Sequence, residues 1–352
     1  MKGILLLEDG TTFEGRSIGA PGTAVGEAIF ATSMTGYQEM LTDPSFAGQL
    51  LTLTYPLIGN YGVNEEDSES DRVQAGGLII RQICDQPSNW RSTGSLSDYL
   101  KQNDTVAIDG IDTRALTRHL RINGVMMGAI STELTVAELR KTLDEAPPYG
   151  EINYVRSLSS KQALEWPGDV AQPRYHIALI DLGFKRSIAR QFSELGCRVT
   201  ILPYDASAED VLSVQPDGIA FSSGPGDPRL LRASLETARV LIGKRPIWGI
   251  GLGHQLLAMA MGGQVIKLKY GHRGTNHPVK NILTGQVSIT AQNHGYAVDA
   301  VSLPDDVQLT RKSLNDDTAE GLRHRNLPIM SIQYEPEKRL FEEYLELVAA
   351  AS

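Results

Sequence analysis

Short apolar runs alternate with helically spaced segments along the second half of the chain. Four runs are almost wholly apolar, as strands buried on both faces of a sheet are: 176–181, 199–202, 218–221 and 246–250. The segments that follow them place apolar residues at helical spacing, over 185–195, 208–214, 230–242 and 254–261. Strands that alternate with helices form βαβ units, so the pattern predicts a mostly parallel sheet flanked by helices.

The first half of the chain has a different pattern, with short strands, many turns and few helices. Residues 1–10 contain an apolar run that ends in Asp9-Gly10, which predicts a strand followed by a turn. Residues 95–100 and 113–120 have the spacing of short helices. These features predict an α+β domain.

A polar segment separates the two patterns. The cluster Ala146-Pro147-Pro148-Tyr149-Gly150 breaks regular structure, and the residues after it show no sustained periodicity. We therefore expect an N-terminal domain over 1–150, a linker over 151–174 and a C-terminal domain over 175–352. Two domains are also the usual number for a chain of 352 residues.

Composition narrows the classes of partner. The formal net charge is -9, with both signs interspersed, which argues against nucleic acid or an anionic membrane as the main partner. The N-terminal apolar run is too short for a secretory signal, and no apolar stretch reaches membrane-spanning length, so we expect a cytoplasmic location. Cys84 and Cys197 lack metal-like neighbours, which predicts no disulfide, no metal site and two chemically inert thiols.

The segment with the strongest chemical signature is 246–257, a predicted strand, a glycine-flanked turn and a helix. This order is that of a nucleophile elbow, in which the middle residue of the turn projects at a helix N-terminus. That residue is normally Ser or Cys, and here it is Gly251. A dinucleotide-binding loop would need glycine where His254 stands. An ordinary glycine-rich turn explains this segment, taken alone, equally well.

Three further segments follow predicted strands. Residues 221–228 hold two glycines around a proline, whose backbone N–H groups can donate to an oxyanion or to a polar ligand. Residues 290–298 contain an amide, an imidazole and a glycine, and residues 329–337 end in two carboxylates. Each also has a plain structural interpretation: a β-turn, a structural histidine and a solvated acidic turn.

Taken together, in this order and spacing, the four segments resemble the class I glutamine amidotransferase domain. That family has a G-x-C-x-G elbow, an SNGPGDP oxyanion loop, a QNHG-(Phe or Tyr) segment and a final QGHPE that holds the catalytic His and Glu. Other segments resemble the family of carbamoyl-phosphate synthetase small subunits, over 32–45, 54–62, 111–114 and 271–279. The resemblance covers nearly the whole chain.

The resemblance implies a division of labour between two subunits. The N-terminal domain would dock on a large ATP-using subunit, and the C-terminal domain would release ammonia from glutamine. The large subunit would combine ammonia, bicarbonate and phosphate from ATP into carbamoyl phosphate, a precursor of pyrimidines and arginine. No phosphate-binding G-x-x-x-x-G-K-[ST] motif occurs in this chain, so no cofactor is expected here, and ATP and Mg²⁺ are expected on the partner.

The chain departs from the family at the catalytic triad. The nucleophile position is Gly251 and the general-base position is Glu335, while Glu337 keeps the third position. A glycine that precedes the base in the family is replaced by Tyr334, whose ring we expect to crowd the glutamine pocket. Removing even one member of such a triad costs several orders of magnitude in rate, so we expect glutaminase activity to be lost.

Most positions that contact glutamine in the family are retained. One departure is Ser223, which stands where the family has Asn. The resemblance places glutamine contacts at Ser45, Gly224, Gly226, Leu252, Gln255, Asn293, Gly295 and Tyr296.

Three functions are compatible with this combination. The first is an obligate subunit of an ammonia-using synthetase, which stabilises its partner and shapes the path of ammonia. The second is a non-catalytic regulatory module that binds glutamine or another amide. The third is a working glutaminase in which Glu335, or an imported group, activates water.

Overall fold

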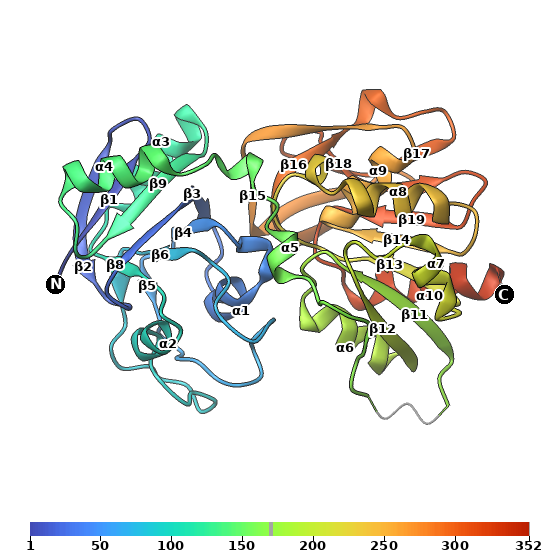
Figure 1. Cartoon of the computed structure of the whole chain (residues 1–352), viewed down its shortest axis with the longest axis horizontal. Coiled ribbons are helices and arrows are strands. Elements are labelled where there is room, and N and C mark those ends of the chain that lie inside the picture. The colour runs from blue at the N-terminus through green and yellow to red at the C-terminus, as the bar shows by residue number, and fades with distance from the viewer. Residues whose placement is uncertain (169–171, 352) are drawn as a thin grey trace. The chain divides into compact units, whose positions relative to one another are not determined.

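The computed structural model describes residues 1–168 and 172–351 and contains two compact units, Met1–Ile152 and Asn153–Ser352. Residues 169–171 of the predicted linker and Ser352 of the predicted C-terminal domain lie outside the described residues. The described part of segment 151–174 contains regular structure, namely α5 (Val155–Leu158) and β10 (Leu164–Glu165). Both elements belong to the C-terminal unit, so this segment is more than a plain linker (Figure 1).

The N-terminal unit is built on a closed barrel with the strand order β1-β2-β8-β6-β4-β3-β9. Successive residues of its central strands enter two different cores: on β4, Leu51 and Leu53 pack in one and Leu50 packs in the other, so this strand is buried on both faces. The barrel strands are β1 (Lys2–Leu7), β2 (Thr12–Ser17), β3 (Thr23–Ala31), β4 (Gln49–Leu53), β6 (Gly77–Ile79), β8 (Ala107–Asp109) and β9 (Met126–Ser131). A separate two-stranded sheet joins β5 (Leu57–Ile58) and β7 (Gln82–Ile83).

Three helices of the N-terminal unit, at Leu96, Thr113 and Val136, begin after side-chain caps. The Asp112 carboxylate accepts from Ala115 N, and Thr135 and Glu138 form a reciprocal capping box. Such caps satisfy backbone N–H groups that lack a partner within the helix. The helices are α1 (Tyr37–Thr42), α2 (Leu96–Gln102), α3 (Thr113–Asn123) and α4 (Val136–Glu145), with short 3₁₀ turns at η1 (Pro44–Phe46) and η2 (Tyr149–Glu151).

The C-terminal unit contains one large sheet with the order β10-β12-β11-β13-β14-β19-β18-β16-β15-β17. Strands β12 to β19 in this order are parallel, and the neighbours beyond β19 are antiparallel. The strands are β11 (Tyr175–Asp181), β12 (Cys197–Pro203), β13 (Gly218–Phe221), β14 (Ile247–Ile250), β15 (Gln264–Asn281), β16 (Val287–Asp299), β17 (Val307–Ser313), β18 (Ala319–His324) and β19 (Ile329–Ile332).

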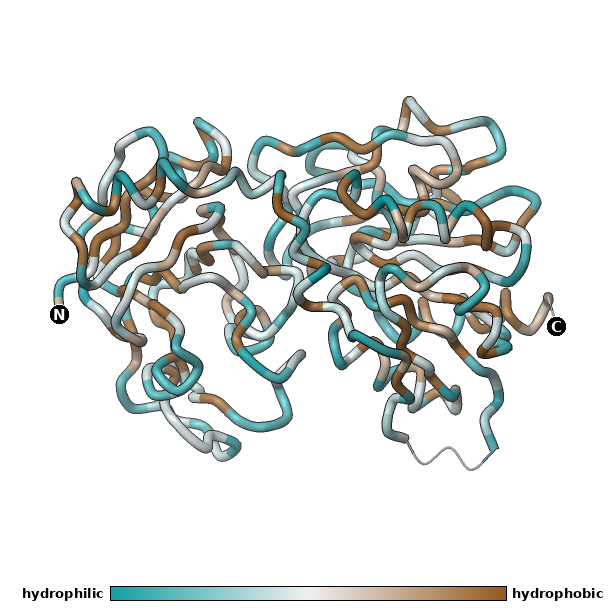
Figure 2. The backbone as a smooth tube through the Cα atoms, in the orientation of Figure 1, coloured by the Kyte–Doolittle hydropathy of each residue, from teal (hydrophilic) through white to brown (hydrophobic). Residues whose placement is uncertain are grey.

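Helices cover both faces of the parallel part of this sheet. Alternate residues of β11 enter opposite cores: Ile177 packs with α6 and α10, and Ala178 packs with α7, α8 and α9. Figure 2 shows the hydrophobic residues concentrated on the strands, with hydrophilic residues on the surrounding turns. The helices are α6 (Arg186–Glu194), α7 (Ala208–Ser213), α8 (Arg232–Leu241), α9 (Leu252–Ala260) and α10 (Lys338–Ala351), with 3₁₀ turns η3 (Pro228–Leu230) and η4 (Ala300–Ser302).

The predicted α/β architecture with a parallel sheet is confirmed, with two shifts of helix boundaries. The helix expected over 254–261 begins two residues earlier, because Gly251 already stands at its N-cap. The helix expected over 230–242 is preceded by the separate turn η3, which Asp227 caps by accepting from Arg229 N. Among the described residues, no helix is long and apolar enough to cross a membrane.

The parallel strands bring the chemically important loops together. Strands β11, β13, β14 and β19 are parallel neighbours, so their carboxyl ends meet at one edge of the sheet. The loops that begin there are the usual position of a binding site in an open α/β sheet.

The aromatic core beneath this edge provides a test of the fold. Trp248 is fully buried on β14, with ring centroids 4.9 Å from Phe341, 5.4 Å from Tyr344 and 5.9 Å from Phe192. We expect Trp248→Ala to lower the free energy of unfolding by about 3–5 kcal/mol, because it leaves a large cavity. Urea denaturation measures this loss. Trp90→Ala is the matched control, since Trp90 is 92% exposed and should change stability by less than about 0.5 kcal/mol.

Candidate functional site

The turn between β14 and α9 has the backbone geometry of a nucleophile elbow. Gly251 has φ of +57° and ψ of −110°, a conformation that side chains disfavour. Its N–H donates to the Ile332 carbonyl at 2.9 Å, which joins the turn to β19. The turn therefore keeps the strand-to-helix reversal that would expose a nucleophile, although position 251 carries no side chain.

The two flanking glycines are required by close packing. A Cβ atom on Gly249 would lie 2.5 Å from the Gly253 carbonyl oxygen, and one on Gly253 would lie 2.2 Å from the Phe221 oxygen. Gly251 is less crowded, because its Cβ would meet the Ser223 Cβ at 3.2 Å. The flanking glycines thus permit the reversal, and the middle position has more space for a side chain than either neighbour.

The loop after β13 lies directly beside this turn. Gly253 N donates to Ser222 O at 3.0 Å, and Leu182 N donates to the Ser222 hydroxyl oxygen at 2.9 Å. Gly224 is held against the main chain, since a Cβ there would lie 1.9 Å from the Leu182 oxygen and 3.0 Å from Leu252 Cδ2. Gly226, with φ of +89°, continues the loop in a conformation that favours glycine.

Leu252 can serve a ligand only through its main chain. Its side chain is 3% exposed and packs in the core between the sheet and α7, α8 and α9. As the first residue of α9, however, its N–H has no acceptor within the helix. The N-terminus of α9 therefore offers backbone donors and a partial positive charge beside Gly251.

Gln255 links three parts of the site. Its side-chain Nε2 donates to the Tyr296 carbonyl at 2.9 Å and to Gln333 Oε1 at 3.0 Å. It therefore connects α9 with β16 and with the end of β19. The guanidinium of Arg229, after the β13 loop, stands 5.7 Å from the centre of the Tyr296 ring.

Several polar atoms of the candidate site residues and of Gln333 are buried without a hydrogen-bond partner. They are Ser223 Oγ, Gln255 Oε1, Gln333 Nε2 and both polar side-chain atoms of Asn293. Buried polar atoms are nearly always paired in folded proteins, so a group of orphaned donors and acceptors marks a place for a polar ligand or ordered water.

Not every predicted contact belongs to this group. Gly295 follows His294 on β16, and a Cβ there would lie 3.2 Å from Arg273 Nη2. Ser45 lies in the N-terminal unit on η1, where its N–H donates to the Asp43 carboxylate at 2.8 Å. The assignment of all these residues as glutamine contacts remains a prediction.

The general-base position is occupied by an ion pair. Lys185 Nζ lies 2.7 Å from Glu335 Oε1, and the Glu335 N–H donates to Ala291 O at 3.0 Å. The Lys185 side chain is 9% exposed, whereas that of Glu335 is 42% exposed. The Glu335 carboxylate therefore already neutralises a largely buried ammonium group.

Sequence reasoning did not single out Lys185. The signal that could have found it is its place in the loop after β11, one of the strands whose carboxyl ends meet at the site. Residue types along the sequence do not show that this lysine contacts a carboxylate 150 positions further along the chain.

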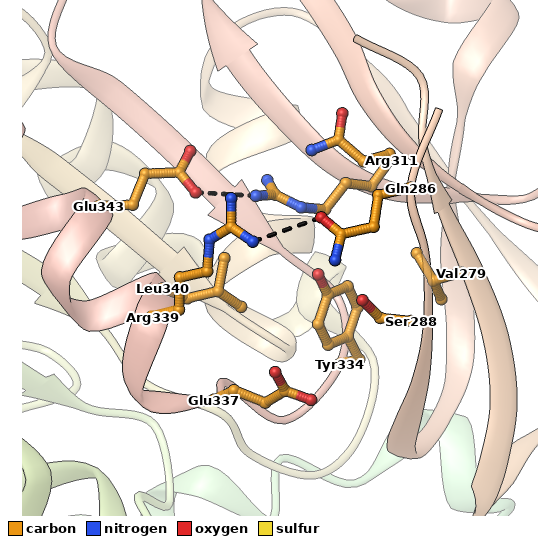
Figure 3. A pocket seen from close by; sticks show the side chains of 10 residues that line it. Val279, Gln286, Ser288, Arg311, Tyr334, Glu337, Arg339, Leu340 and Glu343 are labelled. Carbon is orange, nitrogen blue, oxygen red and sulfur yellow. Dashed lines mark hydrogen bonds and ion pairs between the residues drawn. The ribbon is translucent and has the colours of Figure 1, made fainter. Parts of the chain in front are cut away.

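Tyr334 does not crowd the predicted glutamine pocket, and that expectation was wrong. Just after β19, Gln333 accepts a hydrogen bond from Gln255, whereas the Tyr334 ring packs in the same core cluster as Met330 and Ile332. Figure 3 shows the Tyr334 ring in a separate cavity of about 100 Å³. Its lining residues are Val279, Asn281, Gln286, Ser288, Arg311, Tyr334, Glu337, Arg339, Leu340 and Glu343.

The retained triad position, Glu337, also lines this second cavity. Burial raises the pKa of Tyr334 to about 12, so the phenol stays protonated at neutral pH. An Arg311–Glu343 ion pair of 2.9 Å and a hydrogen bond from Arg339 to Gln286 of 3.3 Å cross the cavity (Figure 3). None of the predicted glutamine contacts is among its lining residues.

Neither cysteine replaces the missing nucleophile. Cys197 is 1% exposed at the amino end of β12, whereas Gly251 follows the carboxyl end of β14 in the same parallel sheet. Burial raises the pKa of the Cys197 thiol to about 11, which opposes formation of a thiolate. Cys84 belongs to the N-terminal unit, where its thiol donates to the Gln86 carbonyl.

In comparison with known proteins, each half of the chain matches a protein-family model. Residues 5–130 match the model for the carbamoyl-phosphate synthase small chain, CPSase domain, and residues 178–350 match glutamine amidotransferase class-I. The carbamoyl phosphate synthase small chain of Syntrophotalea carbinolica is 48% identical, over 99% of this chain and 98% of that protein. That of Thermosynechococcus vestitus is 50% identical, over 95% of this chain and 91% of the relative.

Among solved structures, a glutamine amidotransferase from Thermotoga maritima is similar to part of this chain. It has 18% sequence identity and a TM-score of 0.38, and the match covers 51% of this chain and 86% of that one.

The positive φ at position 251 leads to a prediction. We expect Gly251→Ala to lower the free energy of unfolding by about 1–2 kcal/mol, because a Cβ is disfavoured in this backbone conformation. Chemical denaturation measures the loss. Gly94→Ala is the control and should change stability little, since Gly94 does not have a positive φ and a Cβ there would meet only Val63 Cγ2, at 3.7 Å. A Gly251→Ala variant as stable as the parent would mean that the turn does not hold this geometry.

Proposed function

Because the chain belongs to the family of carbamoyl phosphate synthase small chains, we propose that it is a small subunit that has lost glutamine hydrolysis. Its partner is the large, ATP-using subunit, which supplies the ATP and Mg²⁺ chemistry. The pair forms carbamoyl phosphate from bicarbonate, ATP and free ammonia, for pyrimidine and arginine synthesis in the cytoplasm.

One observation carries the proposal: a nucleophile elbow without a nucleophile. The backbone of Gly251 keeps the reversal between β14 and α9, yet it presents no atom that could attack an amide. Glutamine hydrolysis in this family proceeds through a thioester, which needs a thiolate at that position. A glycine leaves only the donors of the α9 N-terminus and the β13 loop, which stabilise an oxyanion but cannot form it.

The Lys185–Glu335 pair supports the same conclusion. Glu335 would have to take a proton from water and a second group would have to protonate the departing ammonia. The 2.7 Å contact with Lys185 instead occupies the Glu335 carboxylate, and Glu337 lines the separate Tyr334 cavity. Direct hydrolysis of glutamine by this chain is therefore the least favoured of the three functions.

The proposal predicts which nitrogen source the assembled enzyme uses. With the purified large subunit, ATP and bicarbonate, we expect carbamoyl phosphate from ammonium chloride. With glutamine, we expect a rate at least about a thousandfold below that of an intact amidotransferase, since two triad members are absent. The measurement is the rate of carbamoyl phosphate formation with each nitrogen source.

The triple variant Gly251→Cys, Tyr334→Gly, Glu335→His provides the comparison. We expect it to gain glutamine-dependent synthesis. It restores the thiol at position 251, the histidine at position 335 and the glycine that precedes that histidine. Efficient glutamine use by the unmodified chain would contradict the proposal and would show that another group performs the hydrolysis.

The buried polar atoms that lack hydrogen-bond partners favour a second role, the binding of glutamine. Ser223 beside the turn, Gln255 on α9 and Asn293 on β16 carry buried polar atoms without partners. A carboxamide both donates and accepts hydrogen bonds, as these groups require. We therefore also propose that the chain binds glutamine without hydrolysing it and signals its presence to the large subunit.

Calorimetry tests this second role. We expect glutamine to bind the unmodified chain and Asn293→Leu to weaken binding by about tenfold, the effect of about 1.4 kcal/mol from lost hydrogen bonds. Asn326→Ala, at an exposed turn after β18, is the matched control and should bind as the parent does. Absence of binding to the unmodified chain would eliminate the sensor role without affecting ammonia-dependent synthesis.

A further inference from the structure

A second cluster of ionisable groups lies in the C-terminal unit, on the antiparallel strands β15, β16 and β18. His272 on β15 stands opposite His294 on β16, and their ring centroids are 4.9 Å apart. Glu320 on β18 is fully buried, and the two rings are 5% and 8% exposed. One ligand atom from each of the three residues falls within 4.8 Å of the other two.

The outer nitrogen of each ring faces an oxygen that only accepts hydrogen bonds. His272 Nε2 lies 2.8 Å from the Asp316 carboxylate, and His294 Nδ1 lies 2.8 Å from the Tyr296 carbonyl. Both outer nitrogens must therefore carry a hydrogen atom. In neutral rings this fixes the lone pairs on the inner nitrogens, His272 Nδ1 and His294 Nε2.

The inner nitrogens face two further acceptors. Gln292 Oε1 lies 3.0 Å from His272 Nδ1 and 3.0 Å from His294 Nε2. Glu320 Oε1 lies 3.4 Å from His272 Nδ1 and has no hydrogen-bond partner, although it is buried. When both rings are neutral and Glu320 is ionised, four lone-pair atoms thus converge on one volume, and a bound cation would balance them.

Protons satisfy this arrangement only in part. A proton on one inner nitrogen lets that ring donate to Gln292 Oε1, but the other inner nitrogen still faces the same oxygen with its lone pair.

Reversing the Gln292 amide moves the conflict to Glu320. Its Nε2 now donates to Glu320 Oε2 at 3.0 Å and to Thr290 Oγ1 at 3.1 Å. After reversal, the amide oxygen would face Glu320 Oε2, and the two oxygens could pair only through a proton on the Glu320 carboxyl. With Glu320 ionised, one cation among the four acceptors satisfies every contact in the present geometry.

We propose that His272, His294 and Glu320 bind one divalent transition-metal ion of the Zn²⁺ class, with Gln292 Oε1 as the fourth donor. Two imidazoles with oxygen ligands suit such ions, and four ligands suit tetrahedral zinc. The supporting contacts are also present: Asp316 orients His272, the Tyr296 carbonyl orients His294, and Gln292 holds Glu320. The ion would fasten β15, β16 and β18 together next to Asn293 and Gly295.

Metal titration of the purified full-length chain tests the site. After treatment with a chelator, we expect one equivalent of Co²⁺ to bind with the visible absorption of a four-coordinate site, and Zn²⁺ to displace it. We also expect Zn²⁺ to raise the thermal unfolding midpoint, since the ion binds the folded state. Less than a stoichiometric equivalent in the unmodified chain, or no visible absorption, would overturn the proposal.

Two variants and one control locate the ion. Glu320→Gln keeps the shape of the side chain but removes its charge, and Asp316→Asn weakens the support of His272. We expect each to lower metal affinity by at least about tenfold. His324→Gln is the control, because His324 lies on the same strand in a 3.3 Å pair with Asp306 outside the cluster. Unchanged metal affinity in Glu320→Gln, or loss of metal binding in His324→Gln, would show that the ion binds outside the cluster of His272, His294 and Glu320.

Discussion

The reversal of the chain at Gly251 determines how the rest of the candidate site is arranged. It requires a positive φ, and it brings β14, the β13 loop and α9 so close that neither Gly249 nor Gly253 can carry a Cβ. Once this turn is fixed, the N-terminus of α9 faces the glycine-rich loop, and Gln255 reaches β16 and β19. The frame for binding and for oxyanion stabilisation thus depends on backbone packing, and the nucleophile is a separate addition to it.

Under the proposed function, this separation lets the chain keep the family's fold without its chemistry. The constraints on Gly249, Gly253 and Gly224 come from close contacts between main-chain atoms, so replacing any of them would disturb the sheet. The nucleophile and base positions are not constrained in this way. Gly251 fits its backbone conformation better than any larger residue, and Glu335 finds a counterion in Lys185. Both replacements are therefore compatible with a stable protein.

The sequence predicted those features that depend on local periodicity or on contiguous motifs. Alternating strands and helices gave the parallel sheet, and the glycine spacing located the elbow. It could not predict features that depend on side-chain direction or strand register. Tyr334 packs into the core beside Met330 and Ile332, Lys185 meets Glu335 across the sheet edge, and His272 meets His294 through the pairing of β15 with β16.

The two replaced positions also bear on what restoring the proposed lost activity would require. A mutation of Gly251 to cysteine alone would introduce a strained residue of about 1–2 kcal/mol without a base to activate it. A mutation of Glu335 to histidine alone would remove the carboxylate that pairs with Lys185 and would have no thiol to serve. Under the proposed function neither change alone restores hydrolysis, so the two positions are coupled and would have to change together.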